Sequence, residues 1–226
     1  MSTSPHPVSV EAPLRVLVCD DHPLFRRAVV TSLEDAGFDV VAEAASGAEA
    51  IDRAIDHAPD VVLMDLRMPN GSGVEATAAI RRVRPWTRVL VLSVSDDLDE
   101  LVSAFRAGAV GHLRKEESMG VLPDALRTVH LGGVIVGPSL ARGIRLEIDG
   151  TQRRLADASP PSMSESLWSL SDRQADLLDR LAEGADVAGA AAALGIHDAM
   201  ARTELRAAVE GLHRLAELDD AGAEAS

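Results

Sequence analysis

Several residue types are scarce in this chain of 226 residues, and each scarcity excludes a class of protein. Its only cysteine, Cys19, rules out a disulfide framework within the chain and any zinc site built from several cysteines. No run approaches the roughly 18 consecutive apolar residues of a membrane helix. The segment before Leu14 has neither the basic nor the apolar part of a signal peptide. We therefore expect a protein of the reducing cytoplasm that does not contact a membrane.

Basic residues are also few, because 36 Asp and Glu outnumber 22 Lys and Arg and give a formal charge of −14. Only one of those basic residues, Lys115, is a lysine. Non-specific affinity for nucleic acid comes from basic residues that displace counterions. The balance therefore argues against a general polyanion binder, while 46% hydrophobic and 26% charged residues are typical of a folded globular protein.

Short apolar runs alternate with longer amphipathic stretches between Leu14 and about Leu131. Runs rich in Val and Leu that are too short for helices predict strands, and the stretches between them predict helices. Such alternation is typical of a parallel α/β sheet, and nearly continuous apolar strands indicate that helices cover both of its faces. The predicted strands are Leu14–Cys19, Phe38–Ala42, Val61–Met64, Val89–Ser93 and Val110–Leu113, followed by helices at about Pro23–Asp35, Gly47–His57, Val74–Arg84, Leu98–Ala107 and Met119–His130.

The pattern changes after Leu131, where glycines and prolines interrupt it and a Ser- and Pro-rich segment ends near Ser166. Beyond that segment, the chain from Leu167 to about Leu218 reads as helical, with Gly184 and Gly195 as its breaks. The sequence thus predicts an α/β domain at 14–131, a linker at 132–166 and a small all-α domain at 167–218, with tails of no fixed structure at 1–13 and 219–226.

Acidic and hydroxyl side chains stand where the predicted strands end. Asp20 and Asp21 follow the first strand, Asp65 follows the third and Ser93 ends the fourth, while Lys115 comes shortly after the fifth. In a doubly wound sheet the functional site forms at these carboxyl ends. Carboxylates that converge there repel one another unless a cation lies among them, and Mg²⁺ prefers a few carboxylates together with water and phosphate oxygens.

At this point the chain resembles the receiver domain of two-component response regulators, over Leu14 to about Leu131. Asp65 and Ser93 lie 28 residues apart, and Ser93 and Lys115 lie 22 apart, as such domains usually have. The run Asp20-Asp-His-Pro-Leu-Phe-Arg26 is similar to the NarL/LuxR subfamily in particular. The resemblance implies a flavodoxin-like (βα)5 receiver domain, an α/β fold, followed by a small all-α helix-turn-helix domain.

The resemblance also implies a role for each site residue. Asp65 would accept a phosphoryl group from a sensor histidine kinase, so that the chain acts as a phosphoacceptor and not as an enzyme. Asp20, Asp21 and Asp65, with the backbone carbonyl of Arg67, would hold Mg²⁺. Lys115 would pair with the phosphoryl oxygens. Ser93 would turn its hydroxyl to the same group and His112 would rotate inward behind it, although simple packing at the strand edge is the alternative for His112.

The segment from Leu170 to Gly184 resembles the first helix of a LuxR-type helix-turn-helix domain, with Ser171 suited to an N-cap. The following Ala191-Ala-Ala-Leu-Gly195-Ile196 has the small residues and the turn glycine of that motif. The recognition helix would run from His197 to about Leu212. Its candidate DNA contacts are Arg202, Thr203 and Arg206.

Acidic residues leave a second interpretation of this domain open. From Leu167 onward, 12 Asp and Glu face five Arg, and Glu204 stands where relatives commonly have a neutral group. Asp198, Arg202, Arg206, Glu210 and Arg214 follow one another at four-residue steps, so the arginines could be engaged in pairs along the helix. The chain also stops near the place where relatives add a fourth helix that often pairs two domains.

Two functions are therefore carried forward. In the first, phosphorylation controls a homodimeric transcription regulator that binds promoter DNA. In the second, the receiver works in the same way, but the C-terminal domain binds a protein partner and has little or no affinity for DNA.

Overall fold

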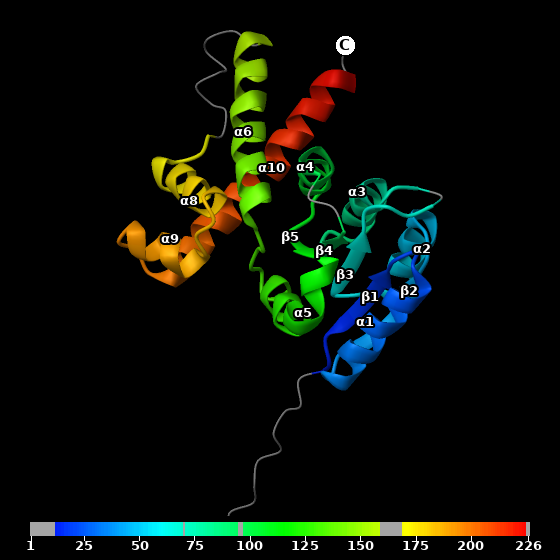
Figure 1. Ribbon diagram of the computed structural model, residues 1–226. Helices are drawn as coiled ribbons and strands as arrows, with labels where there is room; N and C mark the ends of the chain where they lie inside the picture. The colour runs from blue at the N-terminus through cyan, green and yellow to red at the C-terminus, as the bar shows by residue number, and fades with distance from the viewer. Residues whose placement is uncertain (1–11, 70, 95–96, 159–168, 225–226) are drawn as a thin grey trace, which may run out of the picture.

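A five-stranded parallel sheet lies at the centre of the computed structural model, which describes residues 12–69, 71–94, 97–158 and 169–224 (Figure 1). The strand order is β2-β1-β3-β4-β5, which is the doubly wound order of flavodoxin-like proteins. This confirms the predicted fold class. The strands are β1 (Arg15–Cys19), β2 (Asp39–Ala44), β3 (Val61–Asp65), β4 (Arg88–Ser93) and β5 (Gly111–Arg114).

Alternate strand residues point to opposite faces of the sheet, and both faces are covered by helices. Val16, Leu63 and Leu90 belong to a buried cluster on the side of α1 and α5, whereas Leu17 and Met64 belong to a second cluster on the side of α2 and α3. Coverage of both faces explains why the strands are apolar throughout. The helices of this unit are α1 (Pro23–Asp35), α2 (Gly47–His57), α3 (Gly73–Val83), α4 (Leu98–Arg106) and α5 (Lys115–His130).

Local signals in the sequence account for the helix ends. Ser46, Ser72 and Asp97 are N-caps whose side chains accept from the backbone N–H three residues later, and Ser72 forms a full capping box with Glu75. His22 caps α1 in the same way, with Pro23 at the first helical position. The predicted bounds of α1 and α2 agree with the structure, whereas α5 begins at Lys115, earlier than the predicted Met119.

The segment that follows α5 pairs with the edge of the sheet before the chain continues away from the sheet. Ile135 N–H donates to the carbonyl of Val110 and the Ile135 carbonyl accepts from His112 N–H, both at 3.1 Å, so this segment lies along the outer edge of β5. Helix α6 (Pro138–Ala158) follows. It falls within the range 132–166 predicted as a linker, and the domain bounds themselves stay a prediction.

Three further helices complete the described chain: α8 (Asp172–Ala182), α9 (Val187–Ala193) and α10 (Asp198–Glu224). Ser171 caps α8 in a capping box with Gln174, as the sequence predicts. The sequence predicts a tail from residue 219, whereas the backbone continues as α10 to Glu224. The region after the expected recognition helix thus prolongs that helix.

The C-terminal helices share a core with the α/β unit. One buried cluster joins Leu101 and Phe105 of α4 to Ile144 of α6 and to Leu205 and Leu212 of α10. Figure 1 shows α6 and α10 beside α4, away from the β2 edge of the sheet. No helix among the described residues is long and apolar enough to span a membrane.

Candidate functional site

The carboxyl ends of the strands bring the predicted site residues together. Asp65 is the last residue of β3 and Asp20 directly follows β1, with Cys19 paired beside Met64 in the sheet. Ser93 ends β4 beside Arg114 of β5, and Lys115 comes next in the chain. The parallel register therefore places all these side chains at one edge of the sheet, as predicted.

The three acidic residues form a compact oxygen cluster. Asp20, Asp21 and Asp65 each offer a carboxylate oxygen, and these oxygens lie within 4.8 Å of one another. Asp20 and Asp65 are buried, whereas Asp21 is exposed. Among the described residues, the buried Oδ2 of Asp20 has no hydrogen-bond partner apart from the Lys115 ammonium group, which forms an ion pair with it. A hard cation such as Mg²⁺ suits such a donor set, because it binds carboxylate oxygens and keeps water ligands on its open side.

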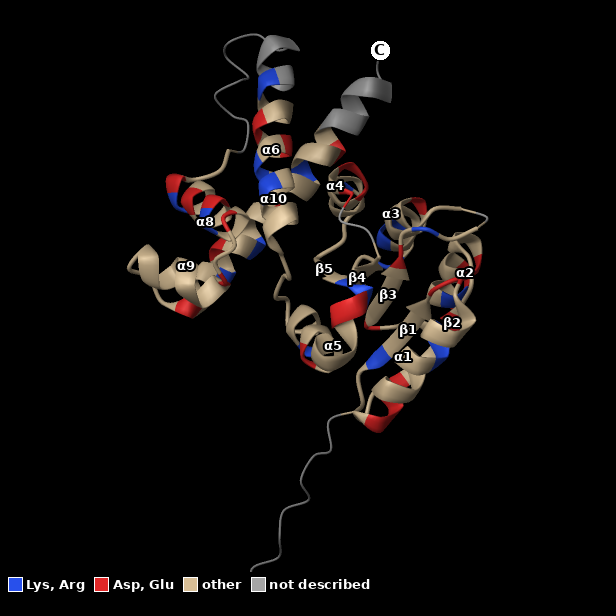
Figure 2. Ribbon diagram, viewed as in Figure 1, with Lys and Arg blue, Asp and Glu red and all other residues tan. Residues whose placement is uncertain are grey.

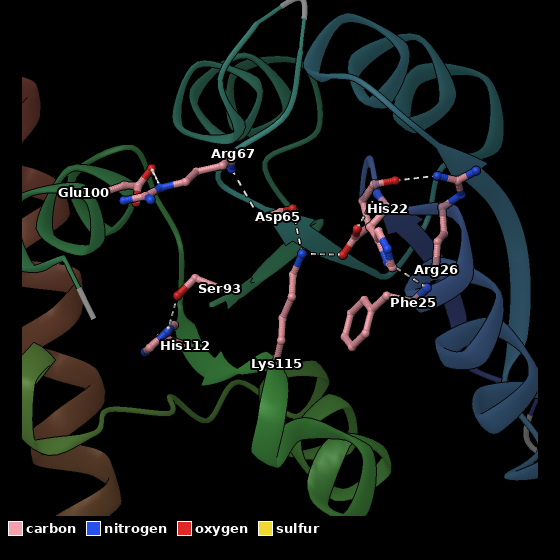
Figure 3. A network of polar contacts seen from close by, with 10 residues as sticks. His22, Phe25, Arg26, Asp65, Arg67, Ser93, Glu100, His112 and Lys115 are labelled. Carbon is pink, nitrogen blue, oxygen red and sulfur yellow. Dashed lines mark hydrogen bonds and ion pairs between the residues drawn. The ribbon is translucent and has the colours of Figure 1, made fainter. Parts of the chain in front are cut away.

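Lys115 lies between two of these carboxylates (Figure 3). Its Nζ is 2.7 Å from Oδ2 of Asp65 and 2.7 Å from Oδ2 of Asp20. The ammonium group also lies 5.1 Å from the centre of the Phe25 ring, which is cation–π distance. Burial alone lowers the pKa of Lys115, but Asp20 and Asp65 outweigh that effect and raise the pKa above its ordinary value. The ammonium form is therefore strongly favoured.

Burial dominates the electrostatics of the phosphoacceptor candidate. It raises the pKa of Asp65 above its ordinary value, although Lys115 and the backbone N–H of Arg67 act in the opposite direction. The Asp65 carboxyl group thus keeps its proton to a higher pH than a carboxyl group in water. It opens onto a cavity of about 530 Å³ lined by Asp21, His22, Phe25, Asp65, Arg67, Val94, Lys115 and Glu116.

The two switch candidates are bonded to each other. Ser93 Oγ lies 3.0 Å from Nε2 of His112, and both side chains are buried (Figure 3). The resemblance implies that His112 rotates inward after phosphorylation, whereas in this structure it already lies inside. For Ser93 to turn to a phosphoryl group, its bond to His112 has to change.

Arg67 contributes to the site through both its backbone and its side chain. Its backbone N–H donates to Oδ1 of Asp65 at 3.2 Å. Its guanidinium turns to the first turn of α4, where Nε lies 3.0 Å from Oε2 of Glu100. The sequence gives no signal for this second contact, because Arg67 and Glu100 are 33 residues apart.

The backbone beside Asp65 requires a glycine at position 73, to which the sequence analysis assigns no role. A Cβ on Gly73 would lie 2.1 Å from the backbone oxygen of Asp65 and 2.8 Å from Cα of Leu66. Only glycine lets α3 begin so close to the end of β3. The signal was present as the run Gly71-Ser-Gly73, which the sequence shows just after the phosphoacceptor candidate.

The candidate DNA contacts are exposed on α10, but two of them have acidic neighbours. Arg202 Nε lies 2.7 Å from Oδ2 of Asp198, and Arg206 Nε lies 3.8 Å from Oε1 of Glu210. Thr203 is exposed and bonds the Ala199 carbonyl. The predicted ladder is thus present in part, and Figure 2 shows acidic and basic residues interspersed along α8 and α10.

The negative charge of Glu204 argues against DNA binding when the sequence alone is considered. In the structure, Glu204 is less exposed than Arg202 and Thr203. Its carboxylate accepts from Nε2 of Gln174 at 3.1 Å and from Nη1 of Arg173 at 3.3 Å. The side chain is only 22% exposed. Glu204 therefore ties α10 to α8, and its charge is met by Arg173.

Comparison with known proteins gives a consistent result. Residues 16–127 match the family model of the response regulator receiver domain. The chain is 35% identical over 211 residues to the probable transcriptional regulatory protein NarL of Mycobacterium tuberculosis, covering 93% of this chain and 91% of that protein. It is 34% identical over 195 residues to the nitrate/nitrite response regulator protein NarP of Escherichia coli, covering 86% of each.

Solved structures of response regulators match different shares of the chain. The signal receiver domain of the putative response regulator NarL from M. tuberculosis matches with a TM-score of 0.51 at 39% identity, covering 53% of this chain and 98% of that one. A LuxR-family two-component response regulator from Aurantimonas matches with a TM-score of 0.55 at 33% identity, covering 60% and 97%. RcsB of Salmonella typhimurium, at 22% identity and a TM-score of 0.52, covers 89% of this chain and shows similarity of fold alone.

Proposed function

Because the chain belongs to the NarL/LuxR-type response regulators of two-component systems, we propose that a sensor histidine kinase phosphorylates it on Asp65 and that it regulates transcription by binding promoter DNA as a homodimer. The observation that carries the phosphorylation is the buried Asp65 carboxylate, bonded to Lys115 and flanked by Asp20 and Asp21. An isolated strand-end aspartate would only cap a helix. This constellation has the nucleophile, the cation and the oxygen ligands that phosphoryl transfer uses.

The transfer itself needs little from the protein beyond position and charge. One carboxylate oxygen of Asp65 forms a bond to phosphorus while the bond from phosphorus to the imidazole nitrogen of the kinase breaks, and the electron pair stays on that nitrogen. Lys115 keeps Asp65 ionised and then pairs with the phosphoryl oxygens. Mg²⁺, held by Asp20, Asp21 and Asp65 with the Arg67 carbonyl, would offset charge on the transferred oxygens.

For DNA, support comes from the exposed face of α10. Arg202, Thr203 and Arg206 are exposed, and the pairs that Arg202 and Arg206 make are short-range contacts at the surface. Such pairs contribute only about 0.3–0.5 kcal/mol within a helix, so a phosphate can replace the acidic partner. Because Glu204 is held by α8, the acidic charge on this face is smaller than the sequence count indicates.

The excess of 12 acidic over five arginine residues beyond Leu167 supports the alternative, in which the C-terminal helices bind a protein partner in response to phosphorylation. The two functions share the receiver chemistry and differ only in output. Recovery of genomic DNA fragments at moderate salt distinguishes them. Enrichment of defined sequences supports promoter binding, and enrichment of none, with and without phosphodonor, supports the alternative.

Phosphorylation is tested on the purified chain with Mg²⁺ and acetyl phosphate as the phosphodonor. We expect the intact mass to increase by one phosphoryl group, which is stable in acid and labile in base. Asp65→Asn keeps the shape of the side chain but removes the nucleophile, so it should gain no mass. Equal labelling of this variant would contradict the assignment.

A further inference from the structure

The guanidinium of Arg67 joins the phosphoacceptor loop to the start of α4. Its Nε lies 3.0 and 3.3 Å from the two carboxylate oxygens of Glu100 (Figure 3). Its Nη2 lies 3.6 Å from Oδ2 of Asp97. Asp97 is also the N-cap of α4. A single arginine from the β3–α3 loop thus holds two acids of the first turn of α4.

The same arginine borders the cavity into which Asp65 opens. Arg67 is two residues from Asp65, and its backbone N–H donates to Oδ1 of Asp65. A phosphoryl group added to Asp65 would therefore lie close to Arg67. A phosphoryl group carries about −1.5 to −2 charges and three acceptor oxygens. Glu100 and Asp97 offer one charge each from separate side chains, and the Arg67 side chain is 56% exposed, so the present ion pairs are weak and exchangeable.

Helix α4 connects this turn to the C-terminal helices. Gly143 of α6 packs so closely on α4 that a Cβ there would lie 2.5 Å from Leu98 and 2.6 Å from Val102. Arg106, at the other end of α4, forms an ion pair with Glu147 of α6. A displacement of the first turn of α4 therefore acts directly on the packing of α6.

We propose that Arg67 is a latch for α4: in the unphosphorylated chain it holds Glu100 and Asp97, and a phosphoryl group on Asp65 draws its guanidinium away and frees the first turn of α4. This inference rests on the proposed phosphorylation of Asp65. It assigns to Arg67 a positioning role that is separate from phosphoryl transfer. The freed turn is the one packed against Gly143, so the latch links the receiver site to α6.

Hydrogen exchange of the full chain tests the latch, with Mg²⁺ present and with or without acetyl phosphate. The intact mass of each sample gives the phosphorylated fraction. In the wild type we expect the α4 amides to exchange about two- to fivefold faster when phosphorylated, the range that loss of an exposed ion pair allows. Unchanged exchange at full phosphorylation overturns the latch and leaves the proposed function intact, whereas absence of a mass increase contradicts the proposed function.

Two substitutions in the same turn, each of which replaces an acid by its amide, make the test specific. Glu100→Gln removes an acid that Arg67 holds, so α4 should exchange faster even without phosphodonor, and phosphorylation should add little. Asp99→Asn removes an equal charge from the residue beside Glu100 in the first turn of α4. Asp99 is exposed, and it forms no contact with Arg67 among those of the described residues. It should keep the wild-type response. An equal phosphorylation response in both variants overturns the latch.

Substitution of the arginine itself separates position from charge. Arg67→Gln should lose the phosphorylation-dependent change in α4 exchange, and Arg67→Lys should retain part of it because a lysine keeps the charge but not the two-pronged contact. A purely structural role of Arg67 would alter the exchange of α4 equally in both phosphorylation states. Retention of the full response by Arg67→Gln contradicts the proposal.

Discussion

Two ion pairs of equal length lie in two regions of the molecule and have different consequences. Lys115 is 2.7 Å from Asp65 in the strand-end site, and Arg202 is 2.7 Å from Asp198 on α10. The first pair has side chains 10% and 6% exposed, and the second 54% and 46%. Because water screens the second pair and not the first, the distance between the atoms does not reveal the strength of either. We therefore expect the chemistry of this chain to take place at the buried strand-end site of the receiver domain and not at the exposed pair on α10.

Lys115→Ala should produce the largest effect, since it leaves Asp20 and Asp65 buried beside each other without their cation. We expect the free energy of unfolding in the absence of Mg²⁺ to fall by about 3 kcal/mol, as measured by urea denaturation. Arg53→Ala is a matched control, because Arg53 pairs with Glu49 at the surface of the same domain. Equal losses in the two variants would contradict the role of burial.

Gly143→Leu tests whether the two regions are held together through α4. The new side chain has to displace Leu98 and Val102, so we expect a loss of about 1–3 kcal/mol in stability. Gly120→Leu, in α5, is the matched control because no atom outside its own helix lies within 4 Å of a Cβ there. A cost no greater than that of Gly120→Leu would show that α6 does not pack on α4 in solution.

His213 of α10 should make the packing between the regions sensitive to acid. Its Nε2 lies 3.1 Å from the Ala109 carbonyl, and burial lowers its pKa from 6.5 to about 4. Between these values the unfolded chain binds the proton and the folded chain does not, so stability is full above pH 6.5 and falls as the pH decreases to 4. We expect a loss of about 1–2 kcal/mol between pH 7 and pH 5.

His213→Gln provides the control for that measurement. Glutamine can still donate to the Ala109 carbonyl but does not titrate, so the pH dependence of unfolding between pH 5 and pH 7 should be smaller by the same amount. Identical pH profiles of the variant and the wild type would exclude His213 as the source.

The smallest effect is expected for Arg202→Ala. The exposed pair with Asp198 should contribute less than about 0.5 kcal/mol to stability, so thermal unfolding should hardly change. If α10 contacts promoter DNA, the same variant should bind a recovered fragment more weakly and with a shallower dependence on salt. Unchanged salt dependence would favour the alternative output.

The sequence predicted the receiver far better than the helices that follow it. Asp20, Asp65 and Lys115 each stand beside a short apolar strand, and parallel order alone brings strand ends together. The sequence does not predict helix α6, because Gly137 and Pro138 stand at its start and its arginines interrupt the apolar pattern to which Leu140 and Ile144 belong. Its structure depends on tertiary packing with α4 and α10, which local sequence signals do not show.

Side-chain direction was the other missing information. Glu204 and Arg202 are both polar residues of α10, yet one is held by α8 and the other lies at the surface. A count of charges treats them alike. In the same way, the family resemblance implies a switch role for His112, but its contact with Ser93 is visible only in the structure.

Localisation of the acyl phosphate tests the central claim most directly. The chain is treated with Mg²⁺ and acetyl phosphate, reduced with borohydride, which converts a phosphorylated aspartate to homoserine, and digested for peptide mass spectrometry. We predict homoserine at position 65 in the wild type and at no position in Asp65→Asn. Homoserine at another aspartate in the wild type, or none despite an increase in intact mass, would contradict the assignment of Asp65 as the phosphoacceptor.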